Sequence, residues 1–261
     1  MPEEKVEGSI LEVEYRTDKK AAILTLSAPP FNIVTVPTRE HLAAVFRDIE
    51  KRDDIRVVII ASQGEHFSSG GDIPGFLNES PEYLSHLAEN VAAPERCSKP
   101  VIARLTGYTF GVGFEIAMAC DFRLAASTTL MALPEMRLGM IPGSGGTQRV
   151  ARIAGVGRAK DMIFRARRIP AQEAKEWGLL TEVVNPDQLD SAVWKLVDEI
   201  LPFSPLALSK AKIAIDQALE TPQETGLKLE GQMYGFLRST EDFQEGVRAF
   251  QEKRPAKFNG K

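Results

Sequence analysis

The feature that most constrains the fold is a continuous apolar run at residues 57–61, because a strand without polar alternation must be covered on both faces. Residues 22–26 form an earlier short strand that a Pro-Pro pair ends. Between the two, residues 38–51 carry apolar side chains at helical spacing, with Thr38 placed to cap the helix. This order of strand, helix and strand predicts a right-handed crossover.

The pattern of strand, turn and helix recurs further along the chain. Residues 100–105 and 122–125 are typical of short strands, and a glycine-rich turn at 107–113 leads into a predicted helix at 114–119. Later helices are predicted at residues 159–165, 171–177, 189–201, 205–219, 221–237 and 243–250. We therefore expect an α/β core over residues 1–185 and a helical region over residues 186–261.

Composition and charge exclude several classes of protein. The content of 43% hydrophobic and 26% charged residues is ordinary for a soluble globular chain. A formal net charge of -4 gives no general attraction to nucleic acid. The N-terminus lacks the apolar segment of a signal peptide, and no apolar stretch is long enough to cross a bilayer. Cys97 and Cys120 form no Cys-x-x-Cys pair, which favours a reducing compartment. We expect a cytoplasmic protein that binds neither nucleic acid nor membranes, although a matrix protein without its transit peptide has the same features.

Two glutamates lie beside glycine-rich or proline-marked sequence. Glu115 falls in the first turn of a predicted helix, where free N–H groups favour an anion. Glu135 follows an apolar stretch and Pro134, and an apolar setting raises a carboxyl pKa toward the range of a catalytic acid or base. Each glutamate alone is equally explained as a partner of a helix N-terminus. Together they predict an acid, a base and an anion pocket in one site.

A further glycine-rich loop, FSSGGD, occupies residues 67–72. Its Gly-Gly pair allows a backbone N–H to approach an oxyanion, although a tight turn between a strand and a helix explains the pair as well. The three histidines lack the spacing of metal ligands, and the chain lacks the Gly-Lys-Ser/Thr of a Walker A motif. The sequence GSGG around Ser144 does not complete a nucleophile elbow. We therefore expect no metal ion.

Several segments together resemble the crotonase superfamily, also called the enoyl-CoA hydratase/isomerase family. They are FSSGGD, GYTFGVGFEIAMACDFRLA, LPEMRLGMIPGSGGTQRVARIAG, IPAQEAKEWGLLTEVV and FQEKRPAKF. The resemblance covers nearly the whole chain. It implies an α/β fold, a spiral of repeated ββα units with a helical C-terminal region, assembled as homotrimers or dimers of trimers. It also implies an acyl-CoA thioester substrate, with coenzyme A as part of that substrate and no other cofactor.

The resemblance assigns roles by position. It implies that the backbone N–H groups of Gly71 and Val112 bind the thioester oxygen and form an oxyanion hole. Glu115 and Glu135 match the two glutamates of enoyl-CoA hydratases: the first helps to deprotonate a water that adds at C3, and the second delivers a proton to C2. Gly143 matches a glycine whose amide helps to orient the water.

The chain departs from the family pattern around the acyl group. Leu133 replaces a glutamine, Phe114 is bulkier than the usual residue, and Val112 adds a branch where many relatives have glycine. These changes predict a reshaped pocket for a branched, cyclic or otherwise unusual enoyl group. The opening PPFNIVTV is similar to hydratases that act on alicyclic dienoyl-CoA esters. Positions that the resemblance places weakly near coenzyme A are Ser69, Asp72, Lys253, Lys257 and Phe258; a solvated basic tail is the alternative for each lysine.

The presence of both glutamates favours hydration, so we expect an enoyl-CoA hydratase, a hydro-lyase. Two alternatives remain open. One is a Δ3-Δ2-enoyl-CoA isomerase, in which one glutamate shuttles a proton and water is excluded. The other is a CoA- or RNA-binding protein without catalysis, and the acidic charge balance argues against the RNA-binding form.

Overall fold

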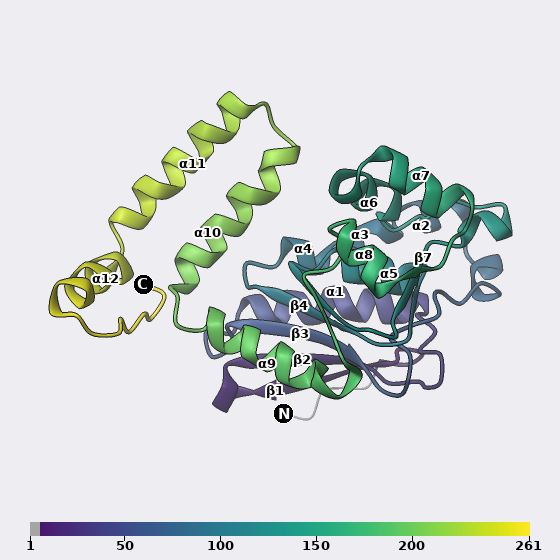
Figure 1. The fold of residues 1–261 in the computed structure, drawn as a ribbon, viewed down its shortest axis with the longest axis horizontal. Helices are drawn as coiled ribbons and strands as arrows, with labels where there is room; N and C mark the ends of the chain where they lie inside the picture. The colour runs from purple at the N-terminus through teal and green to yellow at the C-terminus, as the bar shows by residue number, and fades with distance from the viewer. Residues whose placement is uncertain (1–5) are drawn as a thin grey trace. The chain divides into compact units, whose positions relative to one another are not determined.

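The computed structural model describes residues 6–261, and its contacts divide the chain into two compact units (Figure 1). The first unit comprises Met1–Cys97 and Val101–Val193, and the second comprises Ser98–Pro100 and Trp194–Lys261. Both sheets belong to the first unit.

A six-stranded sheet forms the centre of the first unit, in the order β1-β2-β3-β4-β6-β9. Only the edge strand β1 is antiparallel to its neighbour, and the remaining pairs are parallel. The apolar run predicted as a doubly covered strand is β3, which is buried over its first five residues. The strands are β1 (Leu11–Arg16), β2 (Ala21–Leu26), β3 (Val57–Ser62), β4 (Val101–Leu105), β6 (Phe122–Ala126) and β9 (Glu182–Val184).

A small second sheet was not expected from the sequence. It contains β5 (Tyr108–Phe110), β7 (Leu130–Ala132) and β8 (Ile169–Pro170) in the order β5-β7-β8, with β5 parallel to β7. The prediction that residues 107–113 form only a turn was therefore wrong. Strands of two or three residues are too short to show a period, and glycines on both sides hide them. This sheet matters for the site because β5 leads directly into helix α5.

The first unit also contains α1 (Val36–Glu50), the crossover helix between the parallel strands β2 and β3. Its cap is Thr35 rather than the expected Thr38: the Oγ1 of Thr35 accepts the N–H of Thr38 at 3.2 Å. Helix α6 was not predicted at all, because its glycine-rich start resembles a loop. The other helices are α2 (Pro81–Ser85), α3 (Leu87–Val91), α4 (Ala93–Arg96), α5 (Val112–Met118), α6 (Gly146–Ala154), α7 (Val156–Phe164) and α8 (Ala171–Glu176).

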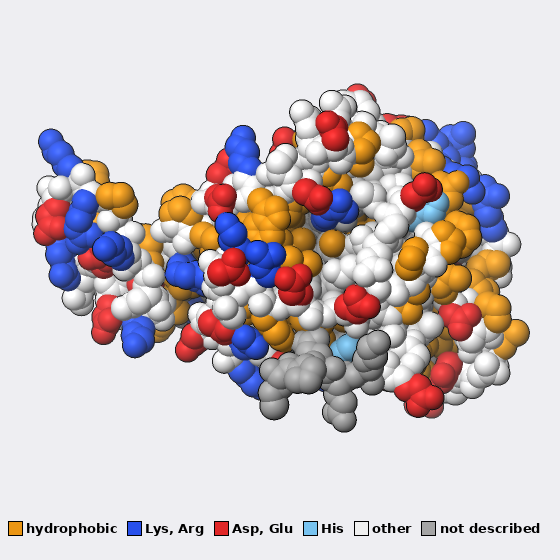
Figure 2. Space-filling view, turned by 90° about the horizontal axis from the view of Figure 1, so that it is seen from below, with side chains coloured by type: hydrophobic (Ala, Val, Ile, Leu, Met, Phe, Trp, Pro, Cys, Tyr) orange, Lys and Arg blue, Asp and Glu red, His pale blue; other side chains and the backbone are white. Residues whose placement is uncertain are grey.

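The second unit is helical, as the sequence indicates. Helices α10 (Pro205–Asp216) and α11 (Gln223–Arg238) pack against each other, and α12 (Glu241–Glu252) follows. Acidic and basic side chains crowd the surface around α12, at the left of Figure 2. Helix α9 (Leu189–Ile200) begins in the first unit and ends in the second, and the boundary expected after residue 185 stays a prediction. None of the helices within residues 6–261 has the length and apolarity needed to cross a membrane.

Helix α5 lies within the core of the first unit, and all seven of its residues are buried. Phe114 and Ile116 belong to the main apolar cluster, which also includes Leu24, Ile60 and Met131 from the strands. A helix buried on every side places any polar residue that it carries in an apolar environment. Glu115 is that residue.

Candidate active site

Glu115 is brought into the core by the turn between β5 and α5. Gly111 in that turn has φ 51° and ψ −130°, a conformation that residues other than glycine rarely adopt. Its carbonyl accepts the N–H of Glu115 at 3.0 Å, which begins the helix. The side chain of Glu115 is 2% exposed.

Two backbone amides hold the carboxylate of Glu115. Its Oε1 accepts the N–H of Ser144 at 2.7 Å and the N–H of Gly146 at 2.9 Å. Gly146 begins α6, so this carboxylate lies at a helix N-terminus, which favours negative charge. A Cβ on Gly146 would lie 3.1 Å from the same oxygen, which explains glycine there. Burial raises the pKa of Glu115, and the two N–H groups oppose that rise.

Glu135 has a different environment. It begins a short 3₁₀ helix, Glu135–Leu138, directly after β7. Its Oε2 is buried and has no hydrogen-bond partner within residues 6–261. Burial is the main cause that raises the pKa of Glu135 to about 7, and the charge of Glu115 contributes to the rise. A carboxyl group with this pKa exchanges protons near neutral pH, as a catalytic acid must.

The carboxyl group of Glu135 approaches the turn that begins the helix of Glu115. A Cβ built on Gly111 would lie 3.1 Å from the Oε1 of Glu135, and Glu115 is hydrogen-bonded through its backbone to Gly111. The sequence hypothesis that both glutamates serve one site therefore agrees with this geometry. Glycine at position 111 leaves the space that Glu135 occupies.

The two expected oxyanion donors lie on neighbouring loops. Ser68 and Phe110 connect these loops, because Phe110 donates its N–H to the Ser68 carbonyl at 2.9 Å. A Cβ on Gly111 would lie 3.4 Å from the Cα of Gly70, so the glycine turns touch. Within the described chain, neither Gly71 nor Val112 donates its backbone N–H to a protein acceptor. Val112 is the first residue of α5, where an N–H has no partner inside the helix.

Three further residues expected at the site lie close to it in the chain. Gly143 is exposed, and the N–H groups that contact Glu115 come from Ser144 and Gly146 instead. The water-orienting role of Gly143 stays a prediction. Phe114 and Leu133 are fully buried members of the apolar core, and their contact with an acyl group also stays a prediction.

Ser69 and Asp72, expected near coenzyme A, lie in the same loop as Gly71. The N–H of Ser69 donates to the carbonyl of Phe31 at 2.8 Å. The Oδ1 of Asp72 accepts the N–H of Gly75 at 3.3 Å. The backbone of Ser69 and the side chain of Asp72 therefore stabilise the loop that presents Gly71, and contact of these residues with coenzyme A stays a prediction.

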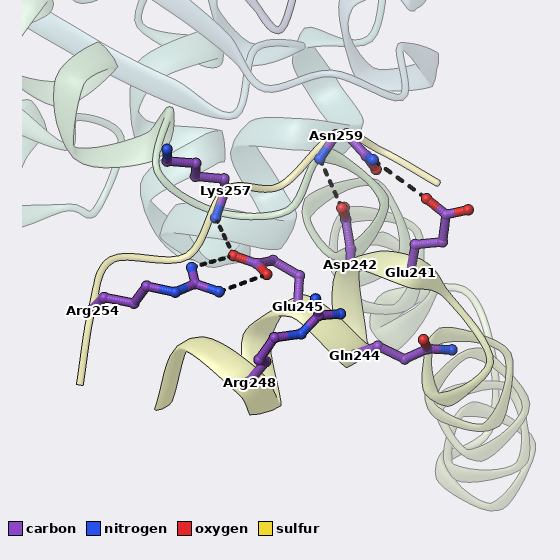
Figure 3. A pocket seen from close by; sticks show the side chains of 8 residues that line it. All are labelled: Glu241, Asp242, Gln244, Glu245, Arg248, Arg254, Lys257 and Asn259. Carbon is purple, nitrogen blue, oxygen red and sulfur yellow. Dashed lines mark hydrogen bonds and ion pairs between the residues drawn. The ribbon is translucent and has the colours of Figure 1, made fainter. Parts of the chain in front are cut away.

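The three tail residues expected near coenzyme A belong to the second unit. Lys253 ends α12 in a left-handed conformation, with φ 53°. The backbone N–H of Lys257 donates to the Oε1 of Glu245 at 3.0 Å, while its ammonium group points away from that carboxylate (Figure 3). Phe258 lines an apolar hollow between α11 and α12. Their role toward coenzyme A stays a prediction.

Sequence reasoning missed Arg39 on α1. This side chain is 3% exposed, and its Nη1 donates to the Oγ of Ser144 at 2.9 Å. Burial lowers the pKa of Arg39 to about 10, and the charges of Glu115 and Glu135 act in the opposite direction. The signal was present in the sequence, because Arg39 shares the apolar face of the helix with Leu42, three positions later.

No group of three or more histidine, cysteine, aspartate or glutamate side chains suited to a metal ion occurs in the described part of the chain.

The profile of the enoyl-CoA hydratase/isomerase family matches residues 16–261. The chain belongs to this family. The crotonase fold expected from the sequence is confirmed by solved structures, including an enoyl-CoA hydratase from Bacillus anthracis with a TM-score of 0.90 and 35% identity, covering 97% of this chain and 100% of that one.

Relatives of the family extend over almost the whole chain. The Bacillus subtilis protein YngF, named as an enoyl-CoA hydratase/isomerase, is 38% identical over 92% of this chain and 94% of its own length. The short-chain-enoyl-CoA hydratase of Clostridium acetobutylicum is 35% identical over 90% and 92%, respectively. The similarity to this family therefore extends over both units of the chain.

Proposed function

We propose that the protein is an enoyl-CoA hydratase, a hydro-lyase that adds water across the 2,3 double bond of an acyl-CoA thioester. The observation that carries this proposal is the pairing of the buried Glu115, in the first turn of α5, with the partly buried Glu135, whose carboxyl group approaches the Gly111 turn that begins this helix. Addition of water requires one proton to leave the water and another to reach carbon. Two carboxyl groups with different environments supply a base and an acid.

The environments support separate roles. Glu115 accepts two N–H groups on Oε1, which favours its charged form and leaves Oε2 to accept a proton from water. Glu135 has a pKa of about 7 and an unpaired buried oxygen, so it carries a proton that it can deliver to C2. Each placed acid or base contributes about 10²–10⁴-fold to the rate.

The thioester oxygen is assigned to the N–H groups of Gly71 and Val112. Both groups lack a protein acceptor within residues 6–261, and the loops that carry them are neighbours. Negative charge develops on this oxygen when hydroxide adds at C3. One such donor is worth about 2.7–4 kcal/mol in the transition state.

An apolar acyl group fits the side chains that follow the two loops. Ile73 and Leu77 come after Gly71 and are exposed, as are Met140 and Ile141 after Glu135. These residues follow site residues in the chain, and exposed apolar side chains beside a polar site favour binding of an apolar ligand. We assign the acyl group to this region, with Phe114 and Leu133 shaping it for a branched or alicyclic enoyl group.

Absorbance of the conjugated enoyl thioester tests the reaction directly. Crotonyl-CoA and a set of branched and cyclic enoyl-CoA esters should lose this absorbance when the protein is added, and both Glu115→Gln and Glu135→Gln should abolish the loss. A 3-enoyl-CoA ester distinguishes the alternative. If the wild-type protein converts it to the 2-enoyl ester and leaves every 2-enoyl ester unhydrated, the protein is an isomerase and the hydratase proposal is wrong.

The family resemblance also supports a homotrimer or dimer of trimers that uses no cofactor beyond the coenzyme A of its substrate, and the sequence features given above support a cytoplasmic location. Sedimentation at several concentrations tests the assembly. Titration with CoA, comparing wild type with Lys257→Ala, tests the tail assignment. Unchanged affinity would remove Lys257 from the binding site.

A further inference from the structure

Arg39 is a buried cation whose burial the stability of the fold does not explain. Its Nη1 contacts the Ser144 hydroxyl, its guanidinium lies 5.3 Å from the Phe76 ring centroid, and its Nε has no hydrogen-bond partner in the part of the chain that the structure describes. Burying a charge with an unpaired N–H is costly, and an apolar side chain of similar length is often as stable or more stable. A role in the reaction accounts for this cost.

Ser144 connects Arg39 to the catalytic base. The backbone N–H of Ser144 donates to Glu115, its hydroxyl accepts from Arg39, and its carbonyl accepts from the Nη1 of Arg149 at 3.1 Å. Arg149 is in turn paired with Glu95. The turn that presents amides to Glu115 is therefore held by two arginines from different helices, α1 and α6.

Arg39 also affects both carboxyl groups electrostatically. The groups that act on Glu115 are the N–H groups of Ser144 and Gly146 and the guanidinium groups of Arg39 and Arg149. Those that act on Glu135 are its own backbone N–H, Glu115 and Arg39. Arg39 itself faces both glutamates and Tyr83. Arg39 is therefore the cation common to the two carboxyl groups, and it lowers the pKa of each.

We propose that Arg39 is a positioning residue for the hydration reaction: it holds the Ser144 turn against Glu115 and supplies the positive charge that the two carboxyl groups share. This inference rests on the proposed function of the two glutamates. It assigns to α1, a helix outside both glycine turns, control over the protonation of the acid and the base.

Four variants separate charge from contact. Arg39→Met removes both, Arg39→Lys keeps the charge, and Ser144→Ala removes the contact alone. Arg47→Met is the matched control, because it removes an exposed arginine from the same helix. The readouts are kcat and KM for an enoyl-CoA ester across pH, and ¹³C NMR titration of the glutamate carboxyl groups in the resting protein.

Loss of the charge should move the activity profile to higher pH. Without Arg39 the pKa of Glu115 rises, so its ionisation and the acidic limb shift upward. The pKa of Glu135 also rises, so the loss of its proton and the basic limb shift in the same direction. We expect Arg39→Met to lower kcat about 10- to 100-fold, the scale of a misplaced catalytic group, with a smaller effect on KM. Arg39→Lys should restore the limbs, Ser144→Ala should lower kcat without moving them, and Arg47→Met should match wild type.

The inference would be overturned if the acidic and basic limbs of the pH profile stay in place in Arg39→Met, or if they move equally in Arg47→Met. The NMR titration needs no turnover and separates this failure from failure of the proposed function. If no enoyl-CoA is hydrated but the carboxyl pKa values rise in Arg39→Met, the electrostatic role stands and the hydratase proposal fails. If hydration is observed and the carboxyl pKa values are unchanged in Arg39→Met, Arg39 does not have this role.

Discussion

Glu135 in the first unit and Glu245 in the second are the same residue type, but their environments shift the carboxyl pKa in opposite directions. Glu135 is largely buried, has an oxygen without a partner within residues 6–261, and has its pKa raised to about 7. Glu245 lies on α12 and accepts two hydrogen bonds from Arg254, at 2.6 and 3.0 Å, and the N–H of Lys257 (Figure 3). Arg254 is the main cause that lowers the pKa of Glu245 to about 2.

The difference lies in the partners that the fold supplies. A carboxylate with a guanidinium and an amide as partners stays charged over the physiological range and anchors the chain. A carboxyl group placed in an apolar turn keeps the ability to gain and lose a proton. Burial of Glu135 with one oxygen unpaired, and pairing of Glu245 with a guanidinium, set the pKa values of the two glutamates apart.

The glycines beside these two glutamates differ in the same way. Gly111 has positive φ, and a Cβ there would lie 3.1 Å from the Oε1 of Glu135. Gly246 lies inside α12, where a Cβ would make ordinary contact with Phe258 at 3.5 Å. The first glycine is required by backbone conformation and by the site, whereas the second is only a weak point in a helix.

The largest difference is therefore expected between the alanine variants of these two glycines. Gly111→Ala strains the turn by about 1–3 kcal/mol and displaces Glu135, so kcat should fall by about 10²–10⁴-fold, the contribution of a placed acid. Gly246→Ala should keep wild-type activity and stabilise the helix by about 0.5–1 kcal/mol. Steady-state kinetics and thermal unfolding of both variants measure these effects. Full activity in Gly111→Ala would show that Glu135 does not depend on this turn.

The second effect is the pH dependence of stability in Glu135→Gln. Folding raises the pKa of Glu135 from its ordinary value of 4.5 to about 7, so the folded state holds this proton more tightly. The stability that this proton gives is complete below pH 4.5 and is lost as the pH rises through about 7. Glutamine has no such proton. The wild type should therefore lose up to about 3 kcal/mol relative to the variant between pH 4.5 and 7.

Urea unfolding of both proteins at pH 5 and pH 8 measures this change. A control is Glu245→Gln, in which the difference from wild type should stay constant between pH 5 and pH 8, because the contribution of Glu245 to stability is lost only below pH 4.5. If the difference in unfolding free energy between wild type and Glu135→Gln is the same at pH 5 and pH 8, the pKa of Glu135 is not raised and this prediction is wrong.

Much of the fold could be predicted because it depends on long, periodic or continuously apolar segments. Strand β3 and helices α10 and α11 lie close to their expected bounds. The small sheet of β5, β7 and β8 could not be found, since its strands are shorter than one period of any pattern. Helix α6 was also missed, because the glycines at its N-terminus resemble a loop.

The two glutamates of the candidate site could be predicted from the sequence, but the residues that contact and position them could not. Glu115 and Glu135 were visible from the glycines around them. The amides of Ser144 and Gly146 come from a segment about thirty positions beyond Glu115, a contact that only the tertiary fold creates. Arg39 was overlooked because a single arginine in an amphipathic helix is usually assigned to the surface, even where its spacing places it on the apolar face.

The smallest expected effect concerns the anchored glutamate. The pKa of Glu245 is lowered on folding from 4.5 to about 2, so its contribution to stability is present above pH 4.5 and lost as the pH falls through about 2. Because Glu245 and Arg254 form their pair at the surface and are only partly buried, salt screens their attraction and the contribution is small. Glu245→Gln should lower the melting temperature slightly at pH 7 in low salt, and less in 1 M NaCl. Glu135→Gln should show little dependence on salt, because screening hardly reaches a buried group. Equal salt dependence in the two variants would contradict the distinction between a partnered surface carboxylate and a buried carboxyl group.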